Sequence, residues 1–134
     1  MTIFEKIINR EISAEIIYED NMCIAMLDIN PASKGHTLII PKIKSDECHV
    51  DHIWYIPDEY YEHMWKISKK LALHIKEKLK SERIGVLVEG YGVPHAHIHI
   101  IPLEGPKAFE VYPGRDRSLE ASKLKETAEL LMYK

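Results

Sequence analysis

Histidine and apolar residues alternate along one stretch of the chain, residues 94–102, which reads Pro-His-Ala-His-Ile-His-Ile-Ile-Pro. Alternation with a period of two predicts a β-strand that has one open face and one buried face. We therefore expect His95, His97 and His99 on the open face, with neighbouring rings about 7 Å apart. Each imidazole there needs a hydrogen-bond partner or water, and three neighbouring rings cannot all be protonated without repulsion.

The apolar positions elsewhere predict further helices and strands. Apolar residues recur every three or four positions in three segments, which predicts helices over residues 2–10, 57–80 and 118–132. Apolar or alternating runs predict strands over residues 14–19, 22–28, 36–40 and 84–89. Thr2 is the expected N-cap of the first helix, and Asp20-Asn21 is typical of a hairpin turn. Strands joined by hairpin links favour an α+β sandwich over a βαβ repeat.

Length and composition limit the class of protein. The 134 residues are expected to form a single domain, with its core over residues 2–102 and a loop and C-terminal helix over 103–134. The net charge is −3 and the basic residues are scattered, which argues against a nucleic-acid groove. We also expect no membrane partner, because no apolar run is long enough to span a bilayer and the N-terminus resembles no export signal. Cys23 and Cys48 form no CxxC motif, so a reduced cytoplasmic protein is the simplest expectation.

The three alternating histidines allow three interpretations. They can be the polar face of a strand that has no further role. They can bind a metal ion, since imidazole is the commonest metal-binding side chain and three such ligands suit zinc. They can also form a nucleophilic centre, in which the middle histidine reacts and its neighbours handle protons and charge. The spacing alone does not separate the last two interpretations.

Residues 95–101, His-Ala-His-Ile-His-Ile-Ile, resemble the signature of the histidine triad family of nucleotide hydrolases and transferases. Two other regions resemble the family in the same order along the chain, residues 2–8 with 14–20 and residues 28–31 with 35–42. The resemblance is greatest for the small branch that hydrolyses nucleoside phosphoramidates, adenylates or dinucleoside polyphosphates. It implies the histidine triad fold, an α+β fold with a five-stranded antiparallel sheet, one long helix and short flanking helices. It also implies a homodimer in which the sheet is continuous.

The resemblance further implies a mechanism. His97 would attack the α-phosphorus of a purine nucleotide derivative and form a nucleotidyl-histidine, which water then hydrolyses. His95, His99 and His36 would bind the phosphoryl oxygens or steady the nucleophile, and a backbone carbonyl would hold the second nitrogen of His97. A purine nucleotide is therefore the expected substrate, and no cofactor is expected.

Residues outside the triad receive binding roles from the same resemblance. Asp28 would accept hydrogen bonds from the ribose hydroxyls, because an ionised carboxylate only accepts and so suits two neighbouring donors. Backbone N–H groups of the link over residues 90–93 would contact phosphate, since Val88 and Gly92 stand where relatives have an asparagine and a serine. The other residues expected to bind the nucleotide are Ile3, Phe4, Ile7, Leu27, Ile29, Gly92 and Val93.

Two rival functions stay open at this point. One is a zinc hydrolase built on the three strand histidines, although the chain lacks a partnered carboxylate motif such as HExxH. The other is a nucleotide-binding module without turnover, which the altered link over residues 90–93 allows.

Metal binding away from the triad is not expected. Many bacterial relatives hold a structural zinc through two cysteines at the positions of Thr2 and Glu5, so we predict that this zinc is absent. The predicted surface loop over residues 41–57 contains a possible ligand set without a second half, namely Cys48, His49 and His52.

Overall fold

Five strands form one antiparallel sheet in the order β1-β2-β3-β5-β4. The computed structural model describes residues 1–106 and 121–134. The strands are β1 (Ile16–Glu19), β2 (Cys23–Leu27), β3 (Thr37–Pro41), β4 (Arg83–Leu87) and β5 (Ile98–Leu103). The prediction of an α+β fold with a five-stranded antiparallel sheet is therefore confirmed.

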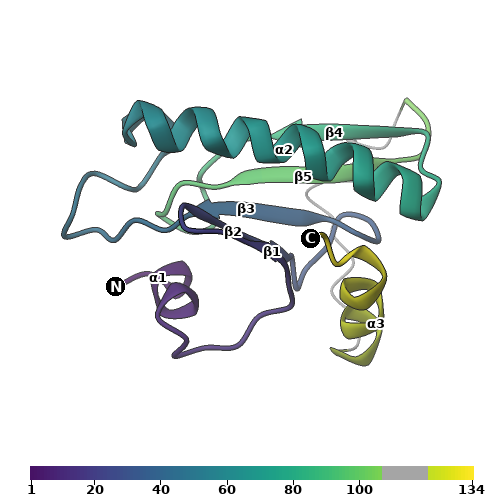
Figure 1. Ribbon diagram of the computed structural model, residues 1–134, viewed down its shortest axis with the longest axis horizontal. Coiled ribbons are helices and arrows are strands. Elements are labelled where there is room, and N and C mark those ends of the chain that lie inside the picture. The colour runs from purple at the N-terminus through teal and green to yellow at the C-terminus, as the bar shows by residue number, and fades with distance from the viewer. Residues whose placement is uncertain (107–120) are drawn as a thin grey trace.

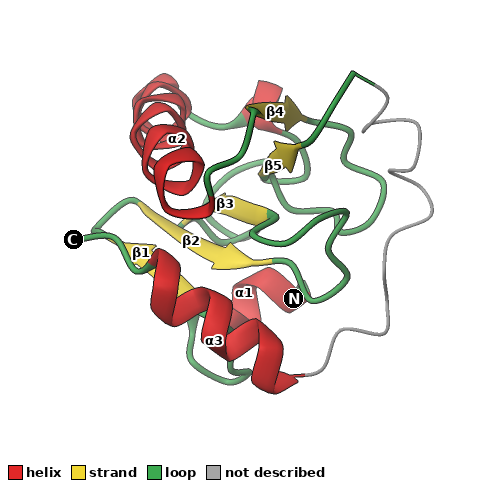
Figure 2. Cartoon of the chain, turned by 90° about the vertical axis from the view of Figure 1, so that its right-hand side faces the viewer, coloured by secondary structure: helices red, strands yellow, loops and turns green. Residues whose placement is uncertain are grey.

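Helices lie on both faces of this sheet. They are α1 (Ile3–Ile8), α2 (Asp58–Leu79) and α3 (Ala121–Leu131), with a short 3-10 helix η1 (Ile53–Tyr55) before α2. The long helix α2 runs along one face, whereas α1 lies against the opposite face (Figure 1). Helix α3 packs beside β1 and also contacts α2 (Figure 2). No described helix combines the length and the apolar character that a membrane span requires.

The central strands β2 and β3 divide their side chains between two apolar clusters. The larger cluster lies between the sheet and α2, and from these strands it takes Cys23, Ala25, Leu27 and Ile39. The smaller cluster lies under α1, where Phe4 and Ile7 pack against Ile24, Met26, Leu38 and Ile40. Because both faces are covered, every residue of β2 is buried, and this explains why its sequence is apolar throughout instead of alternating.

The strand that carries the histidines begins later than the alternation predicts. It starts at Ile98, so residues 94–97 precede the sheet and the prediction of a strand from residue 94 is wrong. In this segment the His95 N–H closes a turn, and the Ala96 N–H bonds the carbonyl of Val50. These two N–H groups therefore make no hydrogen bond to a neighbouring strand of the sheet. The expectation of an open face is also wrong, because His95, His97 and His99 are buried as Ala96 is.

The other predicted elements exist, with boundaries that differ by at most three residues at each described end. Thr2 caps α1 as predicted, in a capping box with Glu5. At the predicted hairpin turn, the carboxylate of Asp20 accepts hydrogen bonds from the backbone N–H groups of Met22 and Cys23. The predicted loop over residues 103–117 and the start of the predicted helix over 118–132 lie largely outside the described residues. The described part of that helix, α3, agrees with the prediction.

Candidate active site

A cavity of about 420 Å³ lies on the face of the sheet that α1 covers. Three segments that are distant in sequence line it: α1, residues 27–29 at the end of β2, and the link before β5. The cavity gathers every residue predicted to bind the nucleotide, namely Ile3, Phe4, Ile7, Leu27, Asp28, Ile29, Gly92 and Val93. Two of the four predicted catalytic histidines, His97 and His99, line it as well.

The backbone holds the ring of His97 in one tautomer. Its Nδ1 lies 2.7 Å from the carbonyl oxygen of His95, and a carbonyl oxygen can only accept a hydrogen bond. Nδ1 therefore carries the proton, and the lone pair of the neutral ring is on Nε2. The ring is buried and packs edge-on against Phe4, with 5.2 Å between the ring centroids. A neutral imidazole with its lone pair fixed on Nε2 is suited to act as a nucleophile.

His36 and His99 form a directed hydrogen-bond chain beside the cavity. Nδ1 of His36 accepts the N–H of Ala32 at 2.9 Å, so the proton of the neutral His36 ring is on Nε2. That Nε2 lies 2.9 Å from Nδ1 of His99, which must then be the acceptor. The proton of a neutral His99 ring is consequently on Nε2. A single backbone N–H, that of Ala32, thus sets the tautomers of both rings.

Asp28 follows the last residue of β2. It lies between the cavity and the hydrogen-bonded rings of His36 and His99. Its Oδ1 accepts the N–H of Asn30 at 2.8 Å, and its Oδ2 lies 3.5 Å from Nε2 of His36. Only 9% of its side chain is exposed. A carboxylate held in this way presents a fixed acceptor to any ligand in the cavity.

His95 does not line the cavity that His97 and His99 line. Its ring is fully buried, with Nε2 3.2 Å from the carbonyl of Pro41 and Nδ1 3.4 Å from the hydroxyl of Thr2. Burial lowers the pKa of His95, although the Pro41 carbonyl and the charge of Glu5 oppose this effect. Two roles were expected of His95, to bind phosphoryl oxygens or to steady the nucleophile, and because both ring nitrogens face the protein the geometry favours the second. The backbone carbonyl of His95 orients His97.

Thr2 and Glu5, the positions at which the family resemblance implies a structural zinc in relatives, belong to a hydrogen-bonded network in this chain. The buried carboxylate of Glu5 accepts from the Thr2 N–H at 3.4 Å and from the Ser45 hydroxyl at 3.3 Å. Burial by itself raises the pKa of Glu5, but these donors and the nearby His95 bring it below its ordinary value. Of the two predicted positions, Thr2 offers a neutral hydroxyl, which is not a usual zinc ligand, and Glu5 belongs to none of the groups of described residues that could hold a metal ion.

Three groups of described residues bring possible metal ligands within 4.8 Å of one another. They are Asp20 with Cys23 and His63, Asp28 with His36 and His99, and Glu89 with His97 and His99. None of them contains His95, so the three triad histidines do not converge as a three-histidine zinc site requires. In the first group, burial raises the pKa of Cys23 to about 12, so the thiol is protonated at neutral pH.

The predicted loop before α2 uses its histidines for stacking. The ring of His49 lies 4.5 Å from that of Tyr55, and the ring of His52 lies 5.5 Å from that of Trp54, measured between centroids. Neither histidine belongs to a metal-binding group of the described residues, and Cys48 does not either. These residues pack the loop against η1.

Glu89 is a cavity residue that the sequence analysis missed. Its Oε1 lies 3.6 Å from Nε2 of His99, and its Oε2 accepts the N–H of Tyr91 at 2.9 Å. The turn that follows depends on Gly90, which has a φ of 76° and at which an added Cβ would lie only 3.3 Å from the His52 ring. The sequence contained one signal for this position: Glu89 is an acidic residue directly before the link over residues 90–93, which leads into the triad segment.

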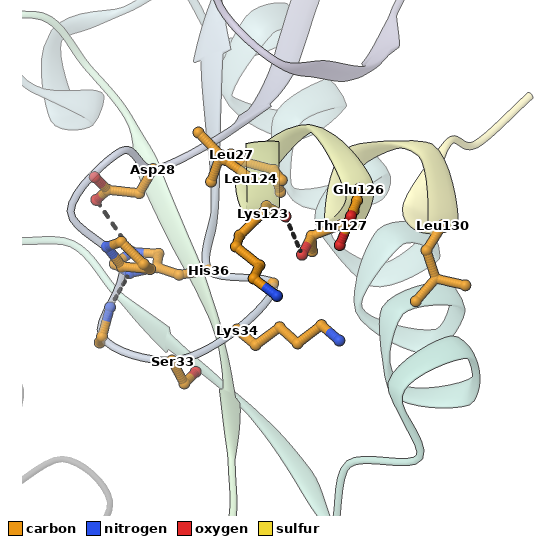
Figure 3. Close-up of a pocket in the computed structure, with 13 residues that line it drawn as sticks. Leu27, Asp28, Ser33, Lys34, His36, Lys123, Leu124, Glu126, Thr127 and Leu130 are labelled. Atoms are coloured by element: carbon orange, nitrogen blue, oxygen red, sulfur yellow. Dashed lines mark hydrogen bonds and ion pairs between the residues drawn. The ribbon is translucent and has the colours of Figure 1, made fainter. Parts of the chain in front are cut away.

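A second cavity, of about 530 Å³, lies between the loop over residues 31–36 and α3 (Figure 3). It shares Leu27 and Asp28 with the first cavity and is also lined by His36. Figure 3 shows the side chains of Lys34 and Lys123 on the α3 side of the Asp28–His36 pair. The pair therefore stands between this second cavity and the cavity that His97 lines.

Residues 9–105 match the model of the HIT domain, the histidine triad family. The chain belongs to the HIT family. The matched part of this HIT protein includes all five strands and α2, together with His36 and the triad segment, whereas α1 and α3 lie outside it.

Relatives of this HIT protein are found among curated proteins and solved structures. An uncharacterized HIT-like protein of Borreliella burgdorferi is 35% identical over 131 residues, covering 92% of this chain and 91% of that protein. The adenosine 5'-monophosphoramidase of Saccharomyces cerevisiae is 35% identical over 111 residues, covering 79% of this chain and 65% of that protein. The crystal structure of a hypothetical histidine triad nucleotide-binding protein from Sulfolobus tokodaii superposes with a TM-score of 0.80 and 30% identity, covering 96% and 88%.

Proposed function

We propose that this HIT protein cleaves a purine nucleotide derivative at its α-phosphorus, through a nucleotidyl intermediate on His97. The observation that carries the proposal is the 2.7 Å contact between Nδ1 of His97 and the His95 carbonyl, which puts the lone pair on Nε2. The similarity to a yeast adenosine 5'-monophosphoramidase supports the same class of substrate.

The reaction consists of two displacements at the same phosphorus. First, Nε2 of His97 donates its electron pair to the α-phosphorus, and the leaving group departs with the electrons of its bond and takes up a proton. The Nδ1–H of the ring, which donates to the His95 carbonyl, stabilises the positive charge that develops on the imidazole. Water then attacks the phosphorus and gives up a proton to solvent, which balances the proton that the leaving group took up. The P–N bond breaks and gives its electrons back to the ring, and the mononucleotide is released. Two smaller barriers replace one large barrier.

Other cavity residues bind and orient the nucleotide in this proposal. The base packs on the apolar wall of α1, formed by Ile3, Phe4 and Ile7. The carboxylate of Asp28 accepts from the ribose hydroxyls. His99, whose tautomer His36 sets, directs its Nε2–H at the phosphoryl oxygens and stabilises charge in the transition state.

The test measures turnover and the covalent adduct together. The wild-type protein is incubated with adenosine 5'-phosphoramidate, diadenosine tetraphosphate and an aminoacyl-adenylate, then analysed rapidly by mass spectrometry. We expect turnover and an adenylyl adduct on His97, and loss of both in His97→Ala. His74→Ala, which alters a helix histidine outside the cavity, should behave as wild type.

The outcomes separate the rival functions. Turnover that persists in His97→Ala refutes the proposed nucleophile. Tight mononucleotide binding with neither adduct nor turnover indicates a binding module. Loss of turnover on treatment with a chelator, with recovery on addition of zinc, indicates a metal hydrolase.

We also propose that the protein is a two-fold dimer joined through β4. Within the described chain β4 has one hydrogen-bonded neighbour, β5, and Val86 in its centre is 42% exposed. An exposed strand edge can pair with a second copy and continue the sheet. Light scattering on the eluted protein should give the mass of a dimer, and a monomer at micromolar concentration would contradict the proposal.

A further inference from the structure

We infer that Glu5 is a positioning residue for His97, and that it acts through Thr2 and His95. Hydrogen bonds would then steady the nucleophile at the place where the family resemblance implies a structural zinc in relatives. The inference rests on the proposed function, in which His97 is the nucleophile, and it adds the start of α1 to the groups on which the reaction depends.

The carboxylate of Glu5 is more than part of a helix cap. In a capping box the third residue of a helix accepts the N–H of the N-cap residue, and Glu5 does so for Thr2 at 3.4 Å. Glu5 is also buried, with only 3% of the residue exposed, and its Oε2 accepts the Ser45 hydroxyl at 3.3 Å. Since Ser45 lies beyond the end of β3, this carboxylate joins the start of α1 to the loop that follows β3.

Thr2 connects this carboxylate to the ring of His95. The Pro41 carbonyl can only accept a hydrogen bond, so Nε2 of the neutral His95 ring carries the proton and Nδ1 carries the lone pair. The Thr2 hydroxyl accepts the N–H of Glu5 at 3.1 Å and lies 3.4 Å from that Nδ1. Oε1 of Glu5 is also within 3.5 Å of the hydroxyl, but this carboxylate already accepts from the Thr2 N–H and from Ser45. The hydroxyl proton is therefore assigned to Nδ1 of His95.

The backbone of His95 and the neighbour of Glu5 both hold the ring of His97. The carbonyl of His95 accepts the Nδ1–H of His97 at 2.7 Å. Phe4 packs edge-on against both rings, with 5.9 Å between its ring centroid and that of His95 and 5.2 Å to that of His97. A displacement of the start of α1 would therefore change two contacts of the nucleophile together.

The effect expected from this network is on the chemical step. Attack at phosphorus requires the lone pair on Nε2 of His97 to be aligned with the bond that breaks, and a displacement of about 1 Å can lower the rate about 100-fold. Neither Glu5 nor Thr2 lines the cavity in which the nucleotide is proposed to bind. Loss of the network should therefore lower kcat more than it raises KM.

The experiment measures kcat and KM for adenosine 5'-phosphoramidate in the wild type and in two matched pairs of variants. Glu5→Ala removes the acceptor, so kcat should fall about tenfold while KM changes by less than about twofold. Glu5→Gln keeps an acceptor oxygen for the Thr2 N–H and should retain most of the activity. Thr2→Val removes the hydroxyl and should resemble Glu5→Ala, whereas Thr2→Ser keeps it and should resemble wild type. Lys6→Gln, at an exposed position of the same helix, is the control.

Metal analysis separates this network from a metal site. The purified wild-type protein should contain no stoichiometric zinc, and treatment with a chelator should change neither kcat nor the melting temperature. Stoichiometric zinc that is lost in Glu5→Ala would make Glu5 a metal ligand and would overturn the inference.

The kinetic results separate the inference from the function on which it rests. Wild-type kcat in Glu5→Ala, or equal losses in Glu5→Ala and Glu5→Gln, overturns positioning by hydrogen bonds and leaves His97 as nucleophile. Absence of turnover and of a covalent adduct in the wild type overturns the proposed function as well. Thermal unfolding shows that the variants compared are folded, and if Glu5→Ala does not fold, the comparison of Thr2→Val with Thr2→Ser decides.

Discussion

Two pairs of aspartate and histidine in this protein have the same chemistry and different surroundings. Asp20 and His63 join β1's hairpin to α2, with 2.6 Å between Oδ2 and Nε2. The same carboxylate also accepts from the Tyr18 hydroxyl at 2.7 Å and from two backbone N–H groups. Asp28 and His36 lie instead between the two cavities, with 3.5 Å between Oδ2 and Nε2, and the same Nε2 is hydrogen-bonded to Nδ1 of His99.

The difference shows how the environment assigns the role of a pair. Asp20 receives four donors and lines neither of the two cavities, so its interactions hold elements of the fold together. Asp28 and His36 are buried at a cavity wall, where a ligand can be the further partner. Without the family resemblance, which points to Asp28 and His36, the residue types alone do not distinguish the two pairs.

Replacing the histidine of each pair by asparagine should give the largest contrast. His36→Asn removes the ring that sets the tautomer of His99, so kcat on adenosine 5'-phosphoramidate should fall about 100-fold. His63→Asn should leave kcat within about twofold of wild type, because this pair is remote from the cavity. If steady-state assays of the two folded variants show equal losses of kcat, then the two pairs do not differ in role.

Removing the carboxylate of Asp20 should affect stability and not activity. Asp20→Ala leaves the Tyr18 hydroxyl, His63 and two N–H groups without their acceptor, so the free energy of unfolding should fall by about 2 kcal/mol. The melting temperature should then fall by about 6 °C, and kcat of the folded variant should be unchanged. Asp46→Ala, at an exposed position, is the control in urea and thermal unfolding, and an equal effect there would contradict the argument.

The same pair predicts how stability depends on pH. Burial raises the pKa of Asp20, but the Tyr18 hydroxyl, His63 and the backbone donors bring it well below the ordinary value of an aspartate. Its stabilising contribution is therefore complete above about pH 4 and is lost as the pH falls toward the folded pKa. Urea unfolding between pH 6 and pH 3 should show a smaller loss of stability in Asp20→Asn than in wild type.

The smallest expected effect concerns the two glycines of the link over residues 90–93, which lines the cavity of the Asp28–His36 pair. Gly90 has a positive φ and lies close to His52, so Gly90→Ala should cost about 1 kcal/mol of stability. A Cβ on Gly92 meets no atom within 4 Å, and Gly92→Ala should be within about 0.5 kcal/mol of wild type. If Gly90→Ala is equally stable in urea unfolding, then the turn does not depend on a glycine at the positive φ of this position.

Local patterns in the sequence determined the elements and many of the residues that meet in the cavity. The apolar runs of β2 and β3, the helical period of α2 and the cap at Thr2 depend on neighbouring positions only, so they are readable without the fold. The histidine triad resemblance added the pocket residues, because the motif keeps the order of the segments that line the cavity.

Only the tertiary structure decided which groups each histidine contacts. His95 turns toward Thr2 and Pro41, and its carbonyl fixes His97, while His36 sets His99 across two strands. Glu89 becomes a cavity residue because the turn at Gly90 directs it there. Hydrogen bonds between segments distant in sequence depend on how sheet, helix and loops pack, and no local period encodes that arrangement.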